Sequence, residues 1–320
     1  MSRSVGSANK QQLFENPFQL EDLMVFDDDT LQHLLDSHAF GLTVEMLGHA
    51  LQEGPEMLTQ RLERLLPLEQ RACLMWMLHH PVASDKAQQA RQQLLDSLFW
   101  ELTYWKTPDL YEELIEGEWL HPDLFPRLAP DLRGSVVLDA GAGTGRASFE
   151  CLRAGAEVVY AMEPSPGLRR ILERKRQQSP EAARLVVCAG RFDAIPLATD
   201  SIDITLACSA FTAVPEQGGE PGLAEMLRVT KPGGKIVLIW PRLEDREWLL
   251  ARGFNYVSLP ISEEMRVHFH SLQSALECAH HFYAKNQAVM YYIRNQRRAD
   301  IPFSVIGINP PCDYCWLEVP

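Results

Sequence analysis

An apolar run that ends in an acid and a glycine-rich loop is the first stretch of this sequence that indicates chemistry. It reads "VVLDAGAGTGRAS" from Val136 to Ser148, with glycines at alternate positions after Asp139. Glycines let a backbone approach a ligand closely and adopt φ angles that other residues avoid. A second acid, Glu163 in "AMEPS", ends the next apolar run. The two stretches together predict a ligand site made of loop backbone and carboxylates.

The spacing of the glycines bears on the class of ligand. A dinucleotide-binding fold uses G-x-G-x-x-G, so that a pyrophosphate rests on the amides of a helix N-terminus. Here the spacing is G-x-G-x-G, and Arg146 stands where that motif has its third glycine. The loop therefore departs from the dinucleotide pattern.

The elements that must position this loop follow from the periodicity of the second half of the chain. From residue 135, short β-rich runs ("SVVLDA", "EVVYAME", "RLVVCAG", "DSIDITLACSA", "GKIVLIWP") alternate with helical stretches ("GRASFECLRAG", "PGLRRILERKRQQ", "GLAEMLRVT"). This alternation predicts βαβ units in a parallel sheet with helices on both faces. Ligands of such sheets bind at the carboxyl ends of the strands, where the glycine loop is expected.

Five motifs in order resemble those of the class I S-adenosylmethionine-dependent methyltransferases. After "VLDAGAGTG" come the acid Glu163, "GRFDAIP", "DSIDITLACSAF" and "RVTKPGGKIVLIWP", which ends at residue 241. The resemblance implies an α/β fold over residues 131–320, with a seven-stranded, mostly parallel sheet and helices on both faces, preceded by an all-α domain. It also implies S-adenosylmethionine as the cofactor and methyl transfer as the reaction.

The resemblance assigns the ribose and methionyl end of the cofactor to residues of the first two motifs. Gly141, Ala142 and Gly143 would lie against the methionyl and ribose parts. Glu163 would accept hydrogen bonds from both ribose hydroxyls. Asp139 would either hold the loop or attract the ammonium group of the cofactor.

The adenine end departs from the family pattern. Many relatives have an Asp that accepts from the adenine amino group at the position of Arg191, and an Arg side chain has no acceptor. We therefore expect the amide of Phe192 and the carboxylate of Asp193 to take this role, with Phe192 as an apolar wall. A simple turn residue is the alternative for Asp193. Cys208, at the end of the fourth strand, is expected beneath the sulfonium or as a small core residue.

Methyl transfer places modest demands on catalytic side chains. Proximity and alignment supply much of the rate, and a base is needed only if the nucleophile arrives protonated. The stretch 265–298 predicts one or two amphipathic helices, and its His268, His270, His280 and His281 are either bases or packing residues. The catalytic residues are thus unassigned, and the acceptor is either a small molecule or a protein side chain.

The front of the chain has a different composition. Residues 1–130 carry 9 Lys and Arg against 21 Asp and Glu, whereas residues 131–320 carry 21 against 22. With the Pro and Gly of "LAPDLRG", this predicts a flexible tail over residues 1–16, an acidic helical domain over residues 17–130 and a cofactor-binding domain over residues 131–320. A front domain of charge −12 argues against nucleic acid as the main partner.

Residues 17–100 resemble the C-terminal domain of the flagellar motor switch protein FliG. The pieces that carry the resemblance are "EDLMVFDDDTLQHLL", "LTVEMLGHAL", "LPLEQRACLMWML" and "HPVASDKAQQARQQLLD". It implies a helical bundle that docks on protein, although Asp29 stands where that family has a basic residue. A lid or dimerisation arm is the alternative; we expect a lid at residues 95–120 and docking by the helices before it. The alternative function is a non-catalytic interaction protein near the flagellar motor.

Composition indicates the class of protein. Hydrophobic residues make up 46% and charged residues 23% of the 320, as in soluble globular proteins. No apolar run approaches the roughly 20 residues that span a bilayer, so a cytoplasmic protein without membrane contact is expected. Seven cysteines without framework spacing predict reduced thiols. "CDYC" at Cys312 and Cys315 is half of a zinc site without a second half, so no metal is expected.

The role assigned to Glu163 leads to a first prediction. Glu163→Ala should weaken S-adenosylmethionine binding by about 1.5–3 kcal/mol, the usual size of a charge-assisted hydrogen bond. Isothermal titration calorimetry on the folded variant measures this. Unchanged affinity would show that the acid does not face the ribose.

Overall fold

The computed structural model describes residues 14–36 and 40–320, so most of the predicted tail at residues 1–16 lies outside the described residues. The chain divides into two compact units. The large unit comprises Phe18–Glu112, Leu120–Ser262 and Pro311–Pro320. The small unit comprises Glu113–Trp119 and Glu263–Pro310, with residues 14–17.

A seven-stranded sheet forms the centre of the large unit. Its strands are β1 (Val136–Ala140), β2 (Val158–Met162), β3 (Leu185–Cys188), β4 (Ile202–Cys208), β5 (Thr230–Ile239), β6 (Asn255–Ser258) and β9 (Asp313–Glu318). They lie in the order β3-β2-β1-β4-β5-β9-β6, and only β9 runs antiparallel to its neighbours. This confirms the predicted fold class. The strand order reverses between β1 and β4, so the glycine loop leaves the sheet at its switch point.

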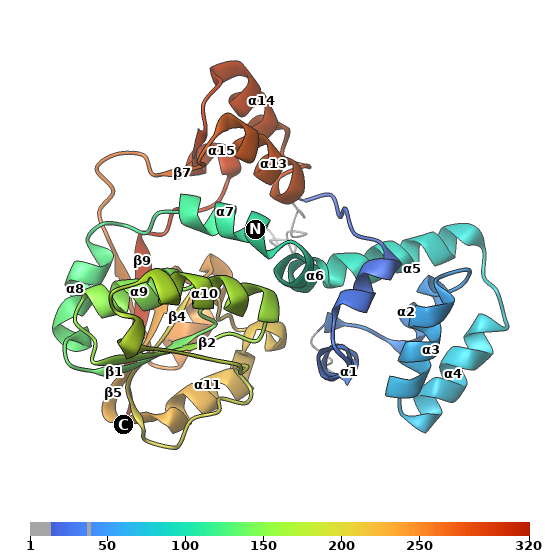
Figure 1. Cartoon of the computed structure of the whole chain (residues 1–320), viewed down its shortest axis with the longest axis horizontal. Helices are drawn as coiled ribbons and strands as arrows, with labels where there is room; N and C mark the ends of the chain where they lie inside the picture. The colour runs from blue at the N-terminus through green and yellow to red at the C-terminus, as the bar shows by residue number, and fades with distance from the viewer. Residues whose placement is uncertain (1–13, 37–39) are drawn as a thin grey trace, which may run out of the picture. The chain divides into compact units, whose positions relative to one another are not determined.

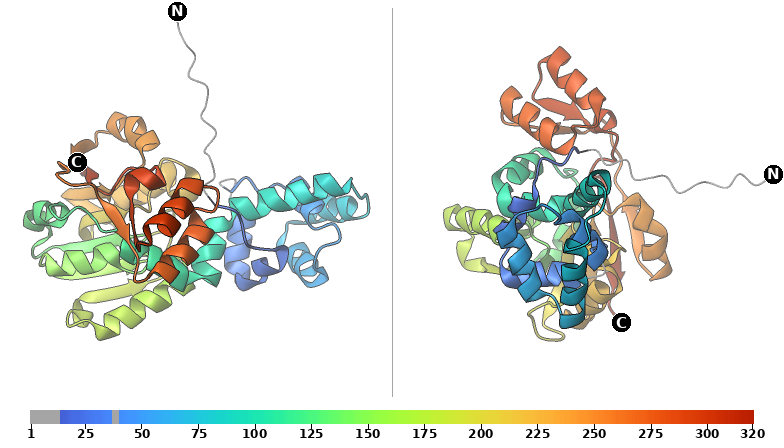
Figure 2. Two further views of the ribbon diagram at one scale, coloured as in Figure 1. Left: turned by 90° about the horizontal axis from the view of Figure 1, so that it is seen from above. Right: turned by 90° about the vertical axis from the view of Figure 1, so that its right-hand side faces the viewer.

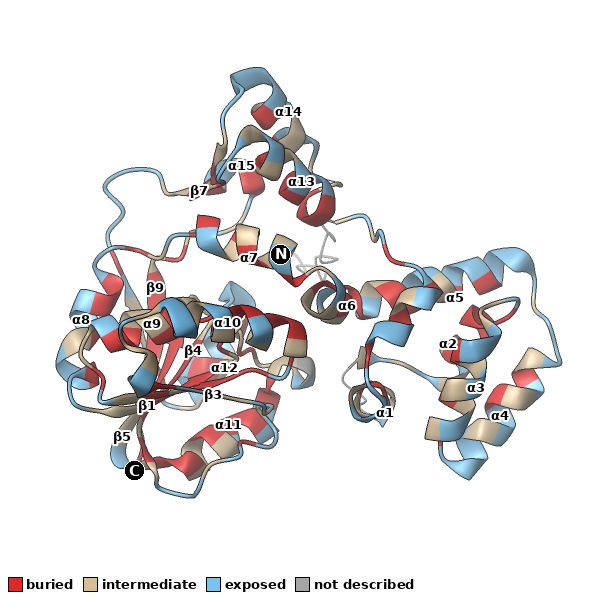
Figure 3. Cartoon of the chain, viewed as in Figure 1, coloured by how far each residue is buried: buried red, intermediate tan, exposed pale blue. Residues whose placement is uncertain are grey.

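Helices cover both faces of this sheet (Figure 1). The helices α8 (Leu124–Leu132), α9 (Arg146–Arg153) and α10 (Pro166–Gln178) pack on the face that carries Val137 and Val159. The helices α11 (Gly219–Val229) and α12 (Arg246–Ala251) pack on the face that carries Leu138 and Ile236. Successive side chains of a strand point to opposite faces, so an apolar strand such as "VVLDA" feeds both cores. Figure 3 shows the central strands as buried.

Short segments complete the large unit. They are η3 (Ala182–Arg184), η4 (Pro215–Gln217) and η5 (Leu243–Asp245). Cys315 is buried in β9, and Cys312 precedes the first residue of that strand. Both thiols are free and lie at or directly before the last strand of the sheet.

The front of the large unit is helical, as predicted. Its elements are η1 (Leu20–Val25), α1 (Asp28–Asp36), α2 (Val44–Ala50), α3 (Glu56–Leu65), α4 (Leu68–Leu78), α5 (Ser84–Ser97) and α6 (Phe99–Lys106). Both views of Figure 2 show α2 to α5 side by side. Their Leu58, Leu62, Leu74 and Leu94 are buried. Apolar side chains at intervals of three and four residues give each helix one buried face.

Two helices link the front of the chain to the sheet. These are α7 (Pro108–Gly117) and α8, and the predicted boundary between residues 130 and 131 falls inside α8. Leu124, Leu128 and Leu132 of α8 are buried in the sheet core. Whether residues 17–130 fold independently stays a prediction, but α8 itself packs with the sheet.

The small unit contains α13 (Leu272–Phe282), α14 (Gln287–Gln296), α15 (Phe303–Ile306) and a hairpin of β7 (Arg266–His268) with β8 (Asp300–Pro302). The two predicted helices are α13 and α14. The prediction was wrong at residues 266–268, which form a strand. Their partner β8 follows some thirty residues later, and such non-local pairing leaves no trace in local periodicity. In the described part of the chain, no helix is long and apolar enough to cross a membrane.

The contribution of α8 to the sheet core can be measured. Leu124 is fully buried, so Leu124→Ala should lower the free energy of unfolding by about 2–5 kcal/mol through lost contacts and a cavity. Urea denaturation followed by circular dichroism measures this. Leu243→Ala, at a side chain that is 56% exposed, is the matched control and should change stability by less than about 0.5 kcal/mol. Equal effects would show that α8 is not part of the core.

Candidate functional site

The glycine loop turns sharply after β1. Gly141 and Gly143 have φ angles of 73° and 57°, in the left-handed region that favours glycine. The amides of Gly141 and Ala142 each donate to the carbonyl of Met162 at 2.9 Å. A Cβ atom on Gly141 would stand 2.7 Å from the Cβ of Ala210, so no side chain fits there. The loop thus presents bare backbone at the carboxyl end of β1.

Glu163 joins this loop to the next strand and helix. One carboxylate oxygen accepts from the amide of Gly143 at 2.9 Å, and the other accepts from the amide of Ser165 at 2.8 Å. Ser165 is in turn the N-cap of α10. Burial raises the pKa of Glu163 to about 7, against the opposing effect of the two amides. Each oxygen keeps a further lone pair, so the carboxylate can still accept from two hydroxyls.

Asp139 lies below the loop, within β1. One oxygen of this fully buried carboxylate accepts from the hydroxyl of Ser148 at 2.5 Å. The other oxygen has no hydrogen-bond partner in the described part of the chain. Burial raises the pKa of Asp139 to about 6. The bond to Ser148 ties β1 to α9, and the bare oxygen leaves an acceptor that a ligand donor would satisfy.

The loop after β3 carries the two residues predicted for the adenine end. The ring of Phe192 lies against Gly141, because a Cβ added to Gly141 would stand 3.2 Å from that ring. The rings of Phe192 and Phe211 meet edge-on, with their centroids 5.4 Å apart. Asp193 forms an ion pair with Arg191, the two atoms Oδ1 and Nε lying 3.0 Å apart. Phe192 is thus brought to the glycine loop, whereas the carboxylate of Asp193 is held by Arg191, two residues before it. Their roles toward adenine stay predictions.

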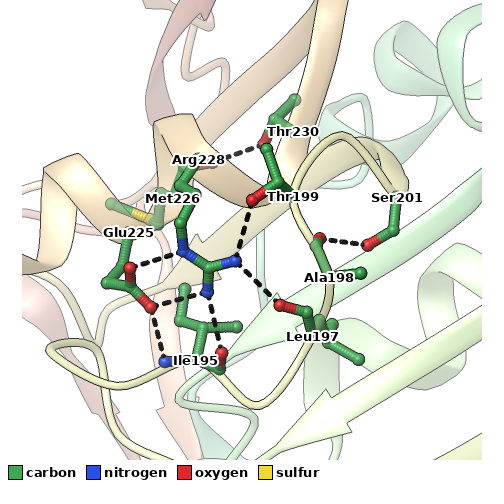
Figure 4. A network of polar contacts seen from close by, with 9 residues as sticks. All are labelled: Ile195, Leu197, Ala198, Thr199, Ser201, Glu225, Met226, Arg228 and Thr230. Atoms are coloured by element: carbon green, nitrogen blue, oxygen red, sulfur yellow. Dashed lines mark hydrogen bonds and ion pairs between the residues drawn. The ribbon is translucent and has the colours of Figure 1, made fainter.

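One arginine fixes the backbone that follows this loop (Figure 4). The guanidinium of Arg228 donates to the carbonyls of Ile195 and Leu197, both at 2.9 Å. It also forms a bidentate pair with Glu225, whose carboxylate accepts from the amide of Ile195 at 3.0 Å. The Arg228 guanidinium holds the pKa of Glu225 below its ordinary value. Two residues of α11 therefore hold the segment that carries Phe192.

The ends of β4 and β5 meet the start of α9 through Arg146. Its guanidinium contacts the sulfur of Cys208 at 3.7 Å and lies 5.9 Å from the ring of Trp240. Burial raises the pKa of Asp139, and the positive charge of Arg146 opposes part of that rise. The sequence pattern identified Arg146 only as the residue in place of a glycine, and the structure adds that it brings a cation to the carboxyl ends of the strands.

Aromatic residues of α6 and α7 lie over the glycine loop. A Cβ on Gly143 would stand 4.0 Å from a ring carbon of Tyr111, and the rings of Tyr104 and Tyr111 meet edge-on at 4.9 Å. The carbonyl of Tyr104 accepts from the hydroxyl of Ser165 at 3.1 Å. Gly167 of α10 makes this approach possible, because a Cβ there would collide with that carbonyl oxygen.

A third carboxylate belongs to this region. Glu101 on α6 is partly buried, and burial together with the nearby Glu163 carboxylate raises its pKa to about 7. The sequence predicted a lid at residues 95–120 but assigned no single residue of it to the site, so Glu101, Tyr104 and Tyr111 were not named. An available signal was an acid among aromatics at helical spacing, since a core helix seldom carries an unpaired carboxylate.

The four histidines proposed as bases all belong to the small unit. The ring of His268 stacks on Trp119 at 4.2 Å, and Nδ1 of His270 lies 2.6 Å from a carboxylate oxygen of Glu113. Burial lowers the pKa of His281 to about 4, and His280 is exposed. Packing or an ion pair therefore explains the positions of His268, His270 and His281. A catalytic role for any of the four histidines stays untested.

Comparison with known proteins agrees with this geometry. Residues 138–238 match a family described as a methyltransferase domain. Over this segment, which is less than half of the chain, the protein is similar to that family. The domain implies S-adenosylmethionine as its cofactor, as predicted. The match covers the glycine loop, Glu163 and the end of β4.

Two relatives show the extent of the similarity. A protein of Geobacillus kaustophilus described as an uncharacterized methyltransferase is 28% identical over 148 residues, 46% of this chain and 66% of the relative. The demethylmenaquinone methyltransferase of Renibacterium salmoninarum is 39% identical over 116 residues, 35% of this chain and 45% of the relative. The chain thus spans less than two thirds of the length of these relatives.

Solved structures share the fold at low identity. A SAM-dependent methyltransferase from Aquifex aeolicus is 16% identical, with a TM-score of 0.38 over 48% of this chain and 93% of the other. The [4+2]-cyclase SpnF is 17% identical, with a TM-score of 0.44 over 69% of this chain and 94% of the other. The resemblance of residues 17–100 to FliG stays a prediction.

The raised pKa values predict how cofactor affinity depends on pH. Both Glu101 and Glu163 have a pKa near 7, above the ordinary value of 4.5. Their carboxyl groups therefore stay partly protonated up to neutral pH and ionise as the pH rises further. A cationic ligand favours the ionised forms, so S-adenosylmethionine should bind more tightly at pH 8 than at pH 6 by about tenfold for each proton released. Calorimetry at both pH values measures this.

Glu101→Gln is the variant that tests this pH dependence. It removes one negative charge beside Glu163, so the rise in cofactor affinity should have its midpoint at a lower pH. The stability of the fold without ligand changes with pH in the opposite direction to cofactor affinity. A carboxyl whose pKa is raised in the folded state destabilises the fold as the pH rises from 4.5 through 7. An affinity that does not change between these pH values would contradict the assignment of the two acids to the site.

Proposed function

We propose that this protein transfers a methyl group from S-adenosylmethionine to a small-molecule or protein acceptor by in-line displacement. The observation that carries the proposal is the group of three carboxylates, Asp139, Glu163 and Glu101, whose pKa values are raised to about 6, 7 and 7. Like charges gathered in a region of low dielectric constant favour a cationic ligand. The sulfonium and ammonium groups of S-adenosylmethionine supply such charges, whereas a pyrophosphate would be repelled.

The residues of the site fit the parts of this cofactor. The bare backbone at Gly141 and Gly143 admits the methionyl and ribose parts, and Glu163 has lone pairs for the ribose hydroxyls. The buried, unpartnered oxygen of Asp139 suits a donor such as the ammonium group. We assign the adenine ring to the side of Phe192, whose backbone segment Arg228 holds in place.

The chain's contribution to the reaction is alignment and exclusion of water. The cofactor supplies a methyl group on a sulfonium, which leaves as a neutral thioether. We propose that α6 and the start of α7 act as the lid expected at residues 95–120, because Tyr104 and Tyr111 lie over the glycine loop. If the nucleophile arrives protonated, we assign its proton to Glu101, whose pKa near 7 suits a base at neutral pH.

A non-catalytic scaffold is the less favoured function. A protein that had lost the cofactor would not need an open space at position 143, where a Cβ would meet only Tyr111, at 4.0 Å. It would also gain stability by replacing Asp139, because a buried carboxylate oxygen without a donor is costly. Both features are retained at the predicted cofactor position.

Transfer of label from the cofactor tests the proposal. The purified full chain is incubated with methyl-tritiated S-adenosylmethionine and a lysate from cells that lack the protein. Label should enter either the protein fraction or the small-molecule fraction, in an amount that grows with enzyme concentration. The acceptor class is the fraction that takes the label.

Gly143→Asn is the matched inactive variant, since a Cβ there would meet only Tyr111, at 4.0 Å, and Asn tolerates the left-handed backbone, so the added side chain enters the proposed cofactor space and not the core. It should abolish both cofactor binding and label transfer while circular dichroism shows an intact fold. The scaffold function would be favoured if the native chain bound the cofactor but transferred no more label than this variant does. Absence of binding by the native chain would overturn the assignment of the site.

A further inference from the structure

A cavity lies among the front helices of the large unit. It has a volume of about 510 Å³ and is lined by residues of η1, α3 and α4. The lining residues are Met24, Met57, Gln60, Arg61, Glu63, Arg64 and Arg71. None of them belongs to the methyltransferase domain at residues 138–238. The proposed methyl transfer therefore gives this cavity no role.

The wall of the cavity is basic although the surrounding sequence is acidic. Three arginines face one acid there, in a part of the chain whose formal charge is −12 over residues 1–130. Arg61 is already engaged, since it pairs with Asp28 at 2.6 Å and donates to the carbonyl of Phe26 at 2.7 Å. Neither Arg64 nor Arg71 has a carboxylate partner among the described residues. Two positive charges of the wall are thus uncompensated.

Arg71 also has an unsatisfied donor. Its Nε atom is buried and has no hydrogen-bond partner in the part of the chain that the structure describes. Its Nη2 atom reaches the carbonyls of Arg64 and Leu66 only at 3.5 and 3.4 Å, at the long limit of hydrogen bonding. A buried N–H without an acceptor costs about 1–3 kcal/mol, and an anionic oxygen would relieve that cost.

Apolar side chains stand beside these charges. Met24 is 37% exposed and Met57 is 73% exposed, and both line the cavity. Leu68, which is 78% exposed, precedes Arg71 by three residues on α4 and so shares its face of the helix. Methionine adapts to partners of varied shape. An exposed apolar surface next to unpaired arginines is typical of a site that binds an acidic segment with an apolar anchor.

We propose that this cavity, named here the Arg64–Arg71 pocket, binds an acidic segment of a partner protein that contributes one aliphatic side chain. The carboxylates would pair with Arg64 and Arg71, and the aliphatic side chain would lie between Met24 and Met57. A short peptide meets only the local positive charge. A long polyanion or an anionic membrane would also meet the charge of −12 on the surrounding domain, and this repulsion favours the peptide.

Fluorescence anisotropy with the full chain tests this proposal without reference to methyl transfer. The probe is a labelled peptide of sequence GEDLEDG, and the control probe is GKKLKKG. The acidic peptide should bind with an affinity that weakens as salt is raised from about 0.05 to 0.5 M, and the basic peptide should not bind at the pocket.

Two variants locate the binding. Arg64→Gln removes an exposed charge whose side chain forms no ion pair among the described residues, and Arg71→Met removes the second charge at similar volume. Each variant should weaken binding of the acidic peptide by about tenfold. Lys86→Met on α5 is the matched control, since Lys86 is exposed and lies outside the pocket, and it should leave affinity within about twofold. Arg64→Gln keeps the test decisive if Arg71→Met unfolds.

Several results would overturn the proposal. One is peptide binding that is equal in the native chain and in Arg64→Gln. Another is saturable binding of single-stranded DNA or phosphatidylserine vesicles that depends on Arg64 while the acidic peptide fails to bind. A third is self-association, measured by sedimentation, that Arg64→Gln abolishes and the acidic peptide does not compete with. In that case the occupant is a second copy of this chain.

Discussion

The hydrogen bonds from the amides of Gly143 and Ser165 to the two oxygens of Glu163 join three elements at the carboxyl end of the sheet. They connect the loop after β1, the end of β2 and the first turn of α10. The carboxylate is therefore part of the frame before any ligand arrives. The same burial that makes these bonds strong also raises its pKa, so the group is stable in its place and responsive to charge nearby.

Much of the sheet could be predicted from the sequence because each strand and helix of residues 135–241 carries its own local signal. The stretches "SVVLDA" and "PGLRRILERKRQQ" differ in period, and the observed β1 and α10 match them within a residue or two. The positions of Gly141, Gly143 and Glu163 at strand ends followed from the same signal. The predicted site residues near the loop therefore lie together in the structure, with Asp193 turned to Arg191 as the exception.

The parts that could not be predicted depend on contacts between distant segments. Nothing in "FWELTYWK" says which face of α6 meets Ser165 more than sixty residues later, so Glu101 and Tyr104 were not assigned to the site. The hairpin of β7 and β8 was missed for the same reason. Arg146 was hard to interpret for a different reason. A motif says which residue a position usually holds, but only the fold shows that the arginine found there contacts the sulfur of Cys208 and the ring of Trp240.

The absence of a side chain at Gly167 has a consequence for tracing the history of this protein. Gly167 is inside α10 with ordinary helical geometry, so its backbone does not require glycine; the carbonyl of Tyr104 does. A descendant that acquires even alanine there must move α6 away from α10. Position 167 is thus a single-letter marker of whether the front helices of a homologue are docked on its sheet, and it can be scored in any new sequence without a structure.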